Sequence, residues 1–248
     1  MGKMVEQIAR AQGHSITVIV DPFAADIPPG TQAAKKIEDA NLNFADAAIE
    51  FTQPETAAAN IIALAKKKIP AVIGTTGWHE RIGEVSKAVE DADSSLLWAS
   101  NFSIGVNLFY RIAWYASELA DNFPEYDIGG FEVHHNKKMD SPSGTAKTLA
   151  EGVISKIKRK KKIIWETMNR KPEADELHFP SLRIGSVPGQ HSLFFDSSAD
   201  TIEITHTARS REGFASGAVR AAQWLAAEKR RGVFTIDDML KDIWKERV

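Results

Sequence analysis

The sequence predicts a two-domain α/β protein: a doubly wound parallel sheet covered by helices, then an α+β domain with a mixed, largely open sheet. In the first part of the chain, short β-branched runs alternate with stretches of helical spacing, which is typical of a parallel sheet. Beyond residue 101, longer strand patterns joined by tight turns indicate a mixed or antiparallel sheet. We expect residues 1–101 and 212–248 in the first domain and residues 102–211 in the second.

The first domain is expected to begin with a helix at 1–13, because apolar residues recur at helical spacing and Gly13 suits a C-cap. A strand at 15–21, a loop at 22–31 and a short polar helix follow. The next strand, 45–52, leads into a helix at 52–68, with Thr52 and Glu55 as a capping box and Pro54 in the first turn. A strand at 69–77, a helix at 78–92 and a strand at 94–101 complete the alternation.

The second domain is expected to hold a long amphipathic helix at 104–124, a strand at 126–136 and a helix that starts at Gly144. Strands at 182–196 and 200–208 come next, and in the latter Ile202, Ile204 and His206 share one face. A final helix at 214–229 returns to the first domain.

Composition excludes several classes of protein. Lys and Arg number 31 and Asp and Glu 33, so a formal net charge of -2 gives no overall attraction to nucleic acid or to an anionic membrane. The absence of cysteine excludes disulfides, thiol catalysis and thiolate metal sites. No apolar run approaches the roughly 20 residues of a membrane span, and the N-terminus does not resemble a signal peptide. We therefore expect a cytoplasmic protein.

The basic run KIKRKKK, residues 156–162, raises the possibility of nucleic-acid binding. It lacks interleaved aromatic residues, and the chain as a whole is slightly acidic. We interpret it as the solvated C-terminal end of a helix, where the helix dipole favours positive charge.

Gly2 and Asp21 are spaced as in a dinucleotide-binding fingerprint, 19 residues apart with a helix and a strand between them. In that fingerprint the glycine lets helix and strand pack closely, and the acidic residue binds the ribose hydroxyls. Asp21 is equally well explained as a turn former. The first strand and first two glycines of the pattern would precede Met1, so we expect the natural polypeptide to begin about a dozen residues upstream. The alternative is a protein that has lost dinucleotide binding.

Small or polar residues follow the other strands of the first domain, as expected where parallel strands present a ligand edge. These are Phe51-Thr52, Gly74-Thr75-Thr76 and Ser100-Asn101. The sequence GTTG at 74–77 offers backbone amides without bulky side chains, which suits a flat cofactor ring, although a plain turn has the same pattern.

The strongest signal is HHNKKMDSPSGT, residues 134–145. Neighbouring residues on a strand point to opposite faces, so His134 and His135 cannot do the same job. A histidine is a natural proton donor near neutral pH, and Ser143, Gly144 and Thr145 open a helix whose N-terminal amides attract a carboxylate. No second set of ligands at metal-binding spacing is near, so we expect no metal. A small polyanionic acid beside a proton donor is the prediction, and a merely structural cluster is the alternative.

Residues 132–146, EVHHNKKMDSPSGTA, closely resemble the signature of the 4-hydroxy-tetrahydrodipicolinate reductase family, also called dihydrodipicolinate reductase. The resemblance covers nearly the whole chain. Its further matches are EFTQPE at 50–55, VIGTTGW at 72–78, SNFSIGVN at 100–107, VPGQHSLFF at 187–195 and ITHTARSREGFASGAVRAA at 204–222.

The resemblance implies a homotetramer with a Rossmann-like nucleotide domain that reduces a cyclic dicarboxylate of lysine and diaminopimelate biosynthesis with NADH or NADPH. His134 would be the general acid and Lys138 its catalytic partner. Substrate would be held by His135, Lys138, Ser143, Gly144 and Thr145. The cofactor would be held by Gly2, Asp21, Phe51, Thr52, Gly74, Thr75, Thr76, Ser100, Asn101 and Phe102.

Two features depart from the family pattern. The arginine that assists a 2′-phosphate is absent, and Asp21 has no basic residue close in sequence, so we favour NADH over NADPH. Two other functions stay open at this point: another two-domain amino-acid-type dehydrogenase, or a non-enzymatic paralogue that binds a dicarboxylate without a nucleotide.

Overall fold

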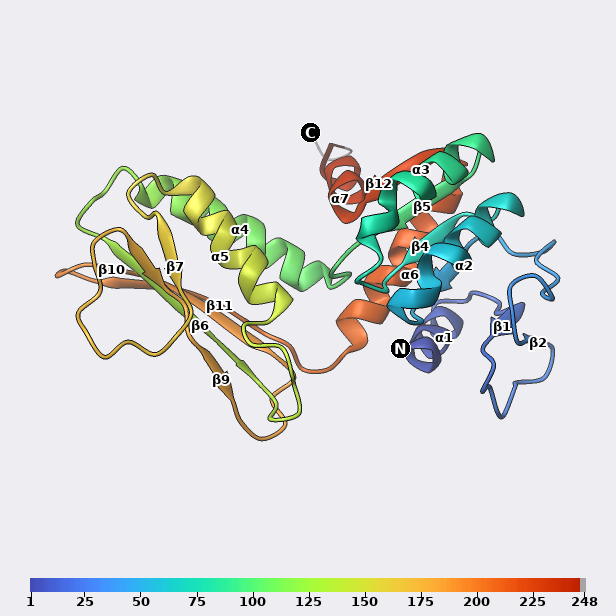
Figure 1. Cartoon of the computed structure of the whole chain (residues 1–248), viewed down its shortest axis with the longest axis horizontal. Coiled ribbons are helices and arrows are strands. Elements are labelled where there is room, and N and C mark those ends of the chain that lie inside the picture. The colour runs from blue at the N-terminus through green and yellow to red at the C-terminus, as the bar shows by residue number, and fades with distance from the viewer. Residues whose placement is uncertain (246–248) are drawn as a thin grey trace. The chain divides into compact units, whose positions relative to one another are not determined.

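The computed structural model of the chain describes residues 1–245 and forms two compact units (Figure 1). The first comprises Met1–Ser103 and Phe214–Val248, and the second comprises Ile104–Gly213. A parallel α/β unit and a mixed-sheet unit are the predicted fold class, which is confirmed.

The first unit is built on a four-stranded parallel sheet with the order β12-β5-β4-β3. Its strands are β3 (Ala48–Glu50), β4 (Ala71–Ile73), β5 (Ser95–Trp98) and β12 (Gly232–Thr235). The helices of this unit are α1 (Gly2–Ala11), α2 (Pro54–Lys66), α3 (Ile82–Asp91), α6 (Glu212–Ala227) and α7 (Ile236–Lys245), with a 3₁₀ turn at His79–Arg81. The strand β12 and the helix α7 were not predicted.

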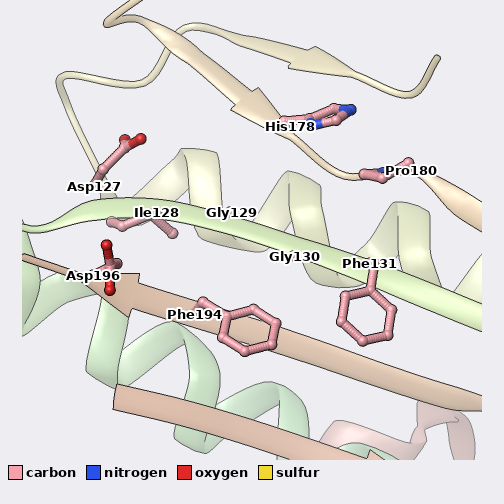
Figure 2. Close-up of a pocket in the computed structure, with 9 residues that line it drawn as sticks. All are labelled: Asp127, Ile128, Gly129, Gly130, Phe131, His178, Pro180, Phe194 and Asp196. Atoms are coloured by element: carbon pink, nitrogen blue, oxygen red, sulfur yellow. The ribbon is translucent and has the colours of Figure 1, made fainter. Parts of the chain in front are cut away.

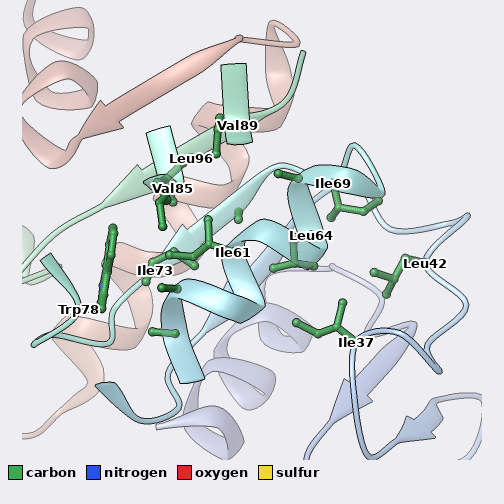
Figure 3. Close-up of a cluster of buried hydrophobic side chains, with 14 of the residues drawn as sticks. Ile37, Leu42, Ile61, Leu64, Ile69, Ile73, Trp78, Val85, Val89 and Leu96 are labelled. Carbon is green, nitrogen blue, oxygen red and sulfur yellow. The ribbon is translucent and has the colours of Figure 1, made fainter. Parts of the chain in front are cut away.

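Two hydrophobic clusters hold this unit together. Side chains of α2 and α3, among them Ile61 and Val85, pack with Ile73 and Leu96 of the sheet (Figure 3). Val5 of α1 and Val219 of α6 form a second cluster, with Ile49 of β3 packed against it. Burial of these faces is the main stabilisation of such a layered arrangement.

The sheet of the first unit is divided. β1 (Val18–Val20) and β2 (Gln32–Ala34) pair in parallel with each other as a separate two-stranded sheet. Among residues 1–245 no strand joins β1 to β3, which is the interval where a doubly wound fold has its central strand.

Two local predictions in the first unit are wrong. The short polar helix expected after the loop is absent, since residues 32–34 pair with β1 instead and tertiary pairing overrides weak local propensity. The capping box is absent because Gln53 is the N-cap, while the Thr52 hydroxyl donates to the buried Glu50 carboxylate. The Pro54 prediction is confirmed, as Pro54 opens α2.

The second unit has a mixed sheet with the order β11-β10-β6-β8-β7, and β9 also pairs with β6. The strands are β6 (Asp127–His134), β7 (Lys162–Ile164), β8 (Glu176–His178), β9 (Ser181–Arg183), β10 (Gln190–Asp196) and β11 (Thr201–Thr207). Two helices, α4 (Ile104–Ala120) and α5 (Gly144–Lys156), pack against one face through a core that includes Leu149, Phe179 and Leu193.

The basic run at 156–162 is the solvated helix end that we expected only in part, since several of its lysines are exposed but Lys160 is buried. The helix α5 ends at Lys156, and the Lys160 side chain is 2% exposed. Its ammonium lies 2.5 Å from Asp127 and donates to the Glu176 carbonyl. Lys160 therefore links β6 to β8 inside the unit and does not contribute to a free cationic surface.

Glu176 of β8 is a buried carboxylate in this sheet. Arg170 donates to both of its oxygens at 2.7 and 2.8 Å, and the Glu173 amide donates at 3.0 Å. The hydrogen bond from Arg170 lowers the pKa of Glu176 to about 2.

No helix within the described part of the chain is long and apolar enough to cross a membrane.

Candidate functional site

A row of titratable side chains crosses the helix-covered face of the second unit's sheet. Glu132 of β6 is the register partner of His191 of β10, which in turn is the register partner of His206 of β11. His134 lies two residues beyond Glu132 on the same strand, so both side chains point to one face. The strand pairing thus gathers a carboxylate and three imidazoles that are dispersed in the sequence.

The carboxylate of Glu132 is fully buried and surrounded by donors. It accepts from the Ser143 amide at 2.9 Å, the Ser143 hydroxyl, the Ser181 hydroxyl at 2.6 Å and the Arg183 guanidinium at 3.0 Å. Burial alone would raise the pKa of Glu132, but the close contacts with His134 and His191 and the hydrogen bonds from these serines more than offset it and hold the pKa well below its usual range. Glu132 is therefore ionised at neutral pH.

His134 is 7% exposed and contacts this carboxylate through one ring nitrogen. Its Nδ1 lies 3.0 Å from Glu132 Oε2, a close ion-pair contact in which the N–H is not aligned for a hydrogen bond. Its Nε2 faces Gly189, where a Cβ atom would lie only 2.9 Å away. Gly189 also has φ +152°, which L side chains rarely adopt, so a glycine is needed there to leave room for the imidazole.

His191 stands behind His134, with ring centroids 5.2 Å apart. Its Nε2 lies 3.5 Å from Glu132 and 3.3 Å from the Ser143 hydroxyl. Burial lowers the pKa of His191, although the hydrogen bond with Glu132 opposes that shift. Burial also lowers the pKa of His206. Both imidazoles are uncharged at neutral pH.

The N-terminus of α5 is tied to the same carboxylate. Ser143 is the N-cap, its hydroxyl accepting from the Ala146 amide at 3.1 Å while it donates to Glu132. Gly144 and Thr145 form the first turn, and a Cβ on Gly144 would meet nothing within 4 Å, so there is open space beside Gly144. Helix N-terminal amides facing open space suit an anion.

Lys138 and His135 lie on the loop between β6 and α5. The Lys138 ammonium is 2.7 Å from Asp140, and the Lys138 amide donates to the His135 carbonyl. Burial raises the pKa of Asp140, but the hydrogen bond from Lys138 outweighs this and lowers it. Arg183 donates to the Asp140 carbonyl as well as to Glu132, so one guanidinium connects this loop to the buried carboxylate.

In the first unit, the structure brings together several of the residues predicted to bind a cofactor. The Thr52 amide donates to the Thr75 hydroxyl at 2.8 Å, which joins the ends of β3 and β4. Gly74 fits against Phe51 so closely that a Cβ would lie 2.0 Å from its ring. Phe51 also contacts Phe102 edge to face.

The remaining predicted cofactor residues have local roles. Asn101 accepts from the Ser103 amide at 2.9 Å, and Ser100 and Thr76 lie at the ends of their strand segments. Gly2 opens α1. The Asp21 carboxylate accepts from the Phe23 amide at 2.8 Å, as a turn former does, and the residue remains exposed.

Sequence reasoning assigned no role to Glu132, His191, Ser181 or Arg183. Glu132 was part of the quoted motif, but nothing marked it as buried. The other three are about 50 residues away in sequence, and only the register of β6 with β9 and β10 places them beside it.

Glu132, His134 and His191 offer ligand atoms within 4.8 Å of one another, which is compatible with a metal ion. However, both Glu132 oxygens already accept hydrogen bonds, and one of the donors is the positively charged Arg183. A cation would have to displace these groups. The arrangement fits a hydrogen-bonded proton-handling cluster better than a metal centre.

Solved structures of other proteins share this fold of a parallel α/β unit and a mixed-sheet unit. An amine dehydrogenase from Mycobacterium smegmatis shares it with a TM-score of 0.60, at 10% identity over 96% of this chain and 92% of that one. A dipicolinate-bound dihydrodipicolinate reductase from Paenisporosarcina sp. TG-14 has a TM-score of 0.74, at 19% identity over 94% and 92%.

The chain belongs to the dihydrodipicolinate reductase family. The family models for the N-terminus and C-terminus of dihydrodipicolinate reductase match residues 1–102 and 105–240. A 4-hydroxy-tetrahydrodipicolinate reductase from Christiangramia forsetii is 38% identical over 99% of this chain and 95% of its own length. The enzyme of that name from Archaeoglobus fulgidus is 37% identical over 97% and 96%. The family resemblance seen in the sequence is confirmed, and an amino-acid dehydrogenase of another family is excluded.

Gly189→Ala is expected to lower the free energy of unfolding by about 2 kcal/mol or more, because it combines an unfavourable φ with a clash against His134. Gly185→Ala is the matched control, since Gly185 is in the same loop with φ +53° but has nothing within 4 Å of its Cβ position. It should cost only about 1–2 kcal/mol. Urea unfolding measures both. Equal losses would show that His134 does not confine the loop.

Proposed function

We propose that this chain is a nicotinamide-dependent reductase that converts 4-hydroxy-tetrahydrodipicolinate to tetrahydrodipicolinate. The observation that carries the proposal is the shared anchoring of His134 and Ser143 on Glu132. It puts a proton donor next to a helix N-terminus that suits a carboxylate, and a cyclic dicarboxylate needs both. The names of the curated relatives support this activity. We also propose that the reaction serves lysine and diaminopimelate biosynthesis in the cytoplasm.

Substrate binding is proposed to start from the two carboxylates. One would accept from the backbone amides of Gly144 and Thr145 and from the Thr145 hydroxyl, at the N-terminus of α5 and beside the open space at Gly144. Lys138 would supply a positive charge, exchanging its contact with Asp140 for the substrate, and His135 would add a further donor. Fixing both carboxylates orients the ring, and orientation contributes strongly to a reaction between two bound molecules.

Proton delivery is assigned to His134 Nε2, the ring nitrogen that does not contact Glu132. The reduced nicotinamide, when bound, supplies a hydride. The His134 proton goes to a ring carbon of the substrate, and the ring gains one hydride and one proton in total. Water is lost from the hydroxylated precursor. After the product leaves, the imidazole recovers its proton from solvent.

The first unit is proposed to hold the nicotinamide cofactor along the ends of β3, β4 and β5. Gly74 packs directly against the Phe51 ring, where a larger residue would clash. Thr52, Thr75, Thr76, Ser100 and Asn101 would offer polar groups to the cofactor. Gly2 at the start of α1 would lie by the pyrophosphate and Asp21 by the adenosine ribose. Because an anionic Asp21 would repel a 2′-phosphate, we propose that NADH is preferred.

His134→Gln should lower kcat by about 10²–10⁴, the range for loss of a general acid, while Lys138→Ala should mainly raise KM for the dicarboxylate. The controls are His178→Gln, a histidine of β8 outside the site, and Lys137→Ala, the adjacent lysine. Steady-state kinetics with 4-hydroxy-tetrahydrodipicolinate and NADH measures all four variants. If the wild-type chain shows no turnover, the proposed reductase activity is refuted and the alternative of a non-enzymatic paralogue is supported.

Asp21→Asn should weaken NADH binding about tenfold while leaving NADPH binding equal or stronger, since it removes a charge-assisted ribose contact and the repulsion of a 2′-phosphate together. The amide keeps an oxygen for the Phe23 turn contact. Asp26→Asn, in the same loop, is the control. Titration calorimetry with each nucleotide gives the affinities. Equal losses for both nucleotides would leave Asp21 with its turn role alone.

We also propose that the face of the second sheet turned away from α4 and α5 binds further copies of the chain, giving a homotetramer. Phe131 and Phe194 stack there with centroids 5.8 Å apart, beside a groove along β6 and β10 (Figure 2). Leu182 of the neighbouring β9 is 53% exposed. The long strand β11 forms an open edge of this sheet, and apolar faces and open edges favour self-association.

Phe194→Lys should convert the tetramer to smaller species, because it places a charge in the proposed interface. Phe44→Lys replaces an equally large aromatic residue that is 82% exposed in the first unit, and it should leave the mass unchanged. Light scattering coupled to size-exclusion chromatography measures the mass. A monomeric wild-type chain would contradict the proposal.

A further inference from the structure

In the proposed reaction His134 donates a proton, but Glu132, the most heavily hydrogen-bonded group of the site, has no assigned role. Glu132 has no exposed surface, so it cannot touch substrate or cofactor. An ionised carboxylate in such a position is costly unless it is fully compensated. Its hydrogen-bond donors and close imidazole contacts come from the N-cap of α5 and from β6, β9 and β10.

The contact with His134 limits which ring nitrogen carries the proton. A neutral imidazole has one N–H and one lone pair. If Nδ1 were unprotonated, its lone pair would face the Glu132 carboxylate at 3.0 Å, two acceptors against each other. Nδ1 is therefore the nitrogen that keeps its hydrogen, and Nε2 is the one that gains and loses a proton. The imperfect alignment of Nδ1 is common before substrate binds.

The same carboxylate also sets the position of the proposed substrate anchor. It accepts from both the amide and the hydroxyl of Ser143, and that hydroxyl caps α5. A shift of Glu132 would therefore move the proton donor and the helix N-terminus relative to each other.

We infer that Glu132 is a positioning residue: it fixes the tautomer of His134 and holds the proton donor in register with the N-terminus of α5. This inference rests on the proposed function. It goes beyond the proposed function by assigning the alignment of the acid and the substrate to Glu132, a buried residue that contacts His134 but not the substrate.

The surrounding charges are consistent with this role. Arg183 of β9 balances the carboxylate from one side at 3.0 Å. His191 of β10 faces it as an uncharged ring, and His206 of β11 lies one strand further away. Lys138 and Asp140 of the loop form an ion pair of no net charge.

The test is Glu132→Gln compared with Glu176→Gln, which removes the other buried, arginine-paired carboxylate of the same sheet. Both variants lose a buried ion pair, so both share any effect of destabilisation. We expect Glu132→Gln to lower kcat by about 10- to 100-fold and to move the alkaline limb of the pH–rate profile to lower pH, with KM for NADH unchanged. Glu176→Gln should alter neither kcat nor the profile. Indistinguishable kinetics for the two variants would overturn the inference.

A second measurement depends neither on turnover nor on the folding of Glu132→Gln. Long-range ¹H–¹⁵N NMR of the wild-type imidazoles reports which nitrogen is protonated, with His134→Gln used for assignment. We expect His134 to carry its hydrogen on Nδ1 when neutral, and a neutral ring protonated on Nε2 overturns the inference. A wild-type chain with the Nδ1 tautomer but no reductase activity would instead refute the proposed function alone.

Discussion

The second unit is organised around one constraint, the burial of an ionised carboxylate. Glu132 needs donors on every side, because an uncompensated charge in a protein interior is strongly unfavourable. Those donors are supplied only if β6 pairs with both β9 and β10 in the observed register and if α5 begins at Ser143. A shift of one residue in either pairing would turn the donors to the opposite face. The geometry of His134 and of the helix N-terminus follows from that one requirement.

The two units divide the chemistry between them. The second carries the charged, proton-handling groups, held by a core of large apolar side chains between the sheet and its two helices. The first carries small and polar residues at the ends of its parallel strands. There the Thr52 amide donates both to the Glu50 carboxylate and to the Thr75 hydroxyl. In the proposed function the second unit would bind the substrate carboxylate and supply the proton, and the first unit would bind the cofactor.

Much of this could be predicted from the sequence, and the exceptions have physical reasons. Alternating strand and helix patterns identified the parallel unit, because hydrophobic periodicity is a local signal. The same local signal placed His134 at a strand end and Ser143 at a helix start. It could not find His191 or Arg183, which reach Glu132 only through strand register. It also misplaced Thr52, whose hydroxyl binds a buried carboxylate rather than capping α2, and Lys160, whose burial depends on Asp127 more than 30 residues earlier.

The central claim is that one carboxylate aligns a proton donor with a carboxylate-binding helix end. It is tested most directly by titrating the wild-type chain with pyridine-2,6-dicarboxylate while NMR follows the His134 imidazole and the Gly144 and Thr145 amides. We expect all three sets of signals to shift together with a single affinity, because the dicarboxylate ring would bind between these groups. Shifts of the amides without any response from His134, or of neither, would contradict it.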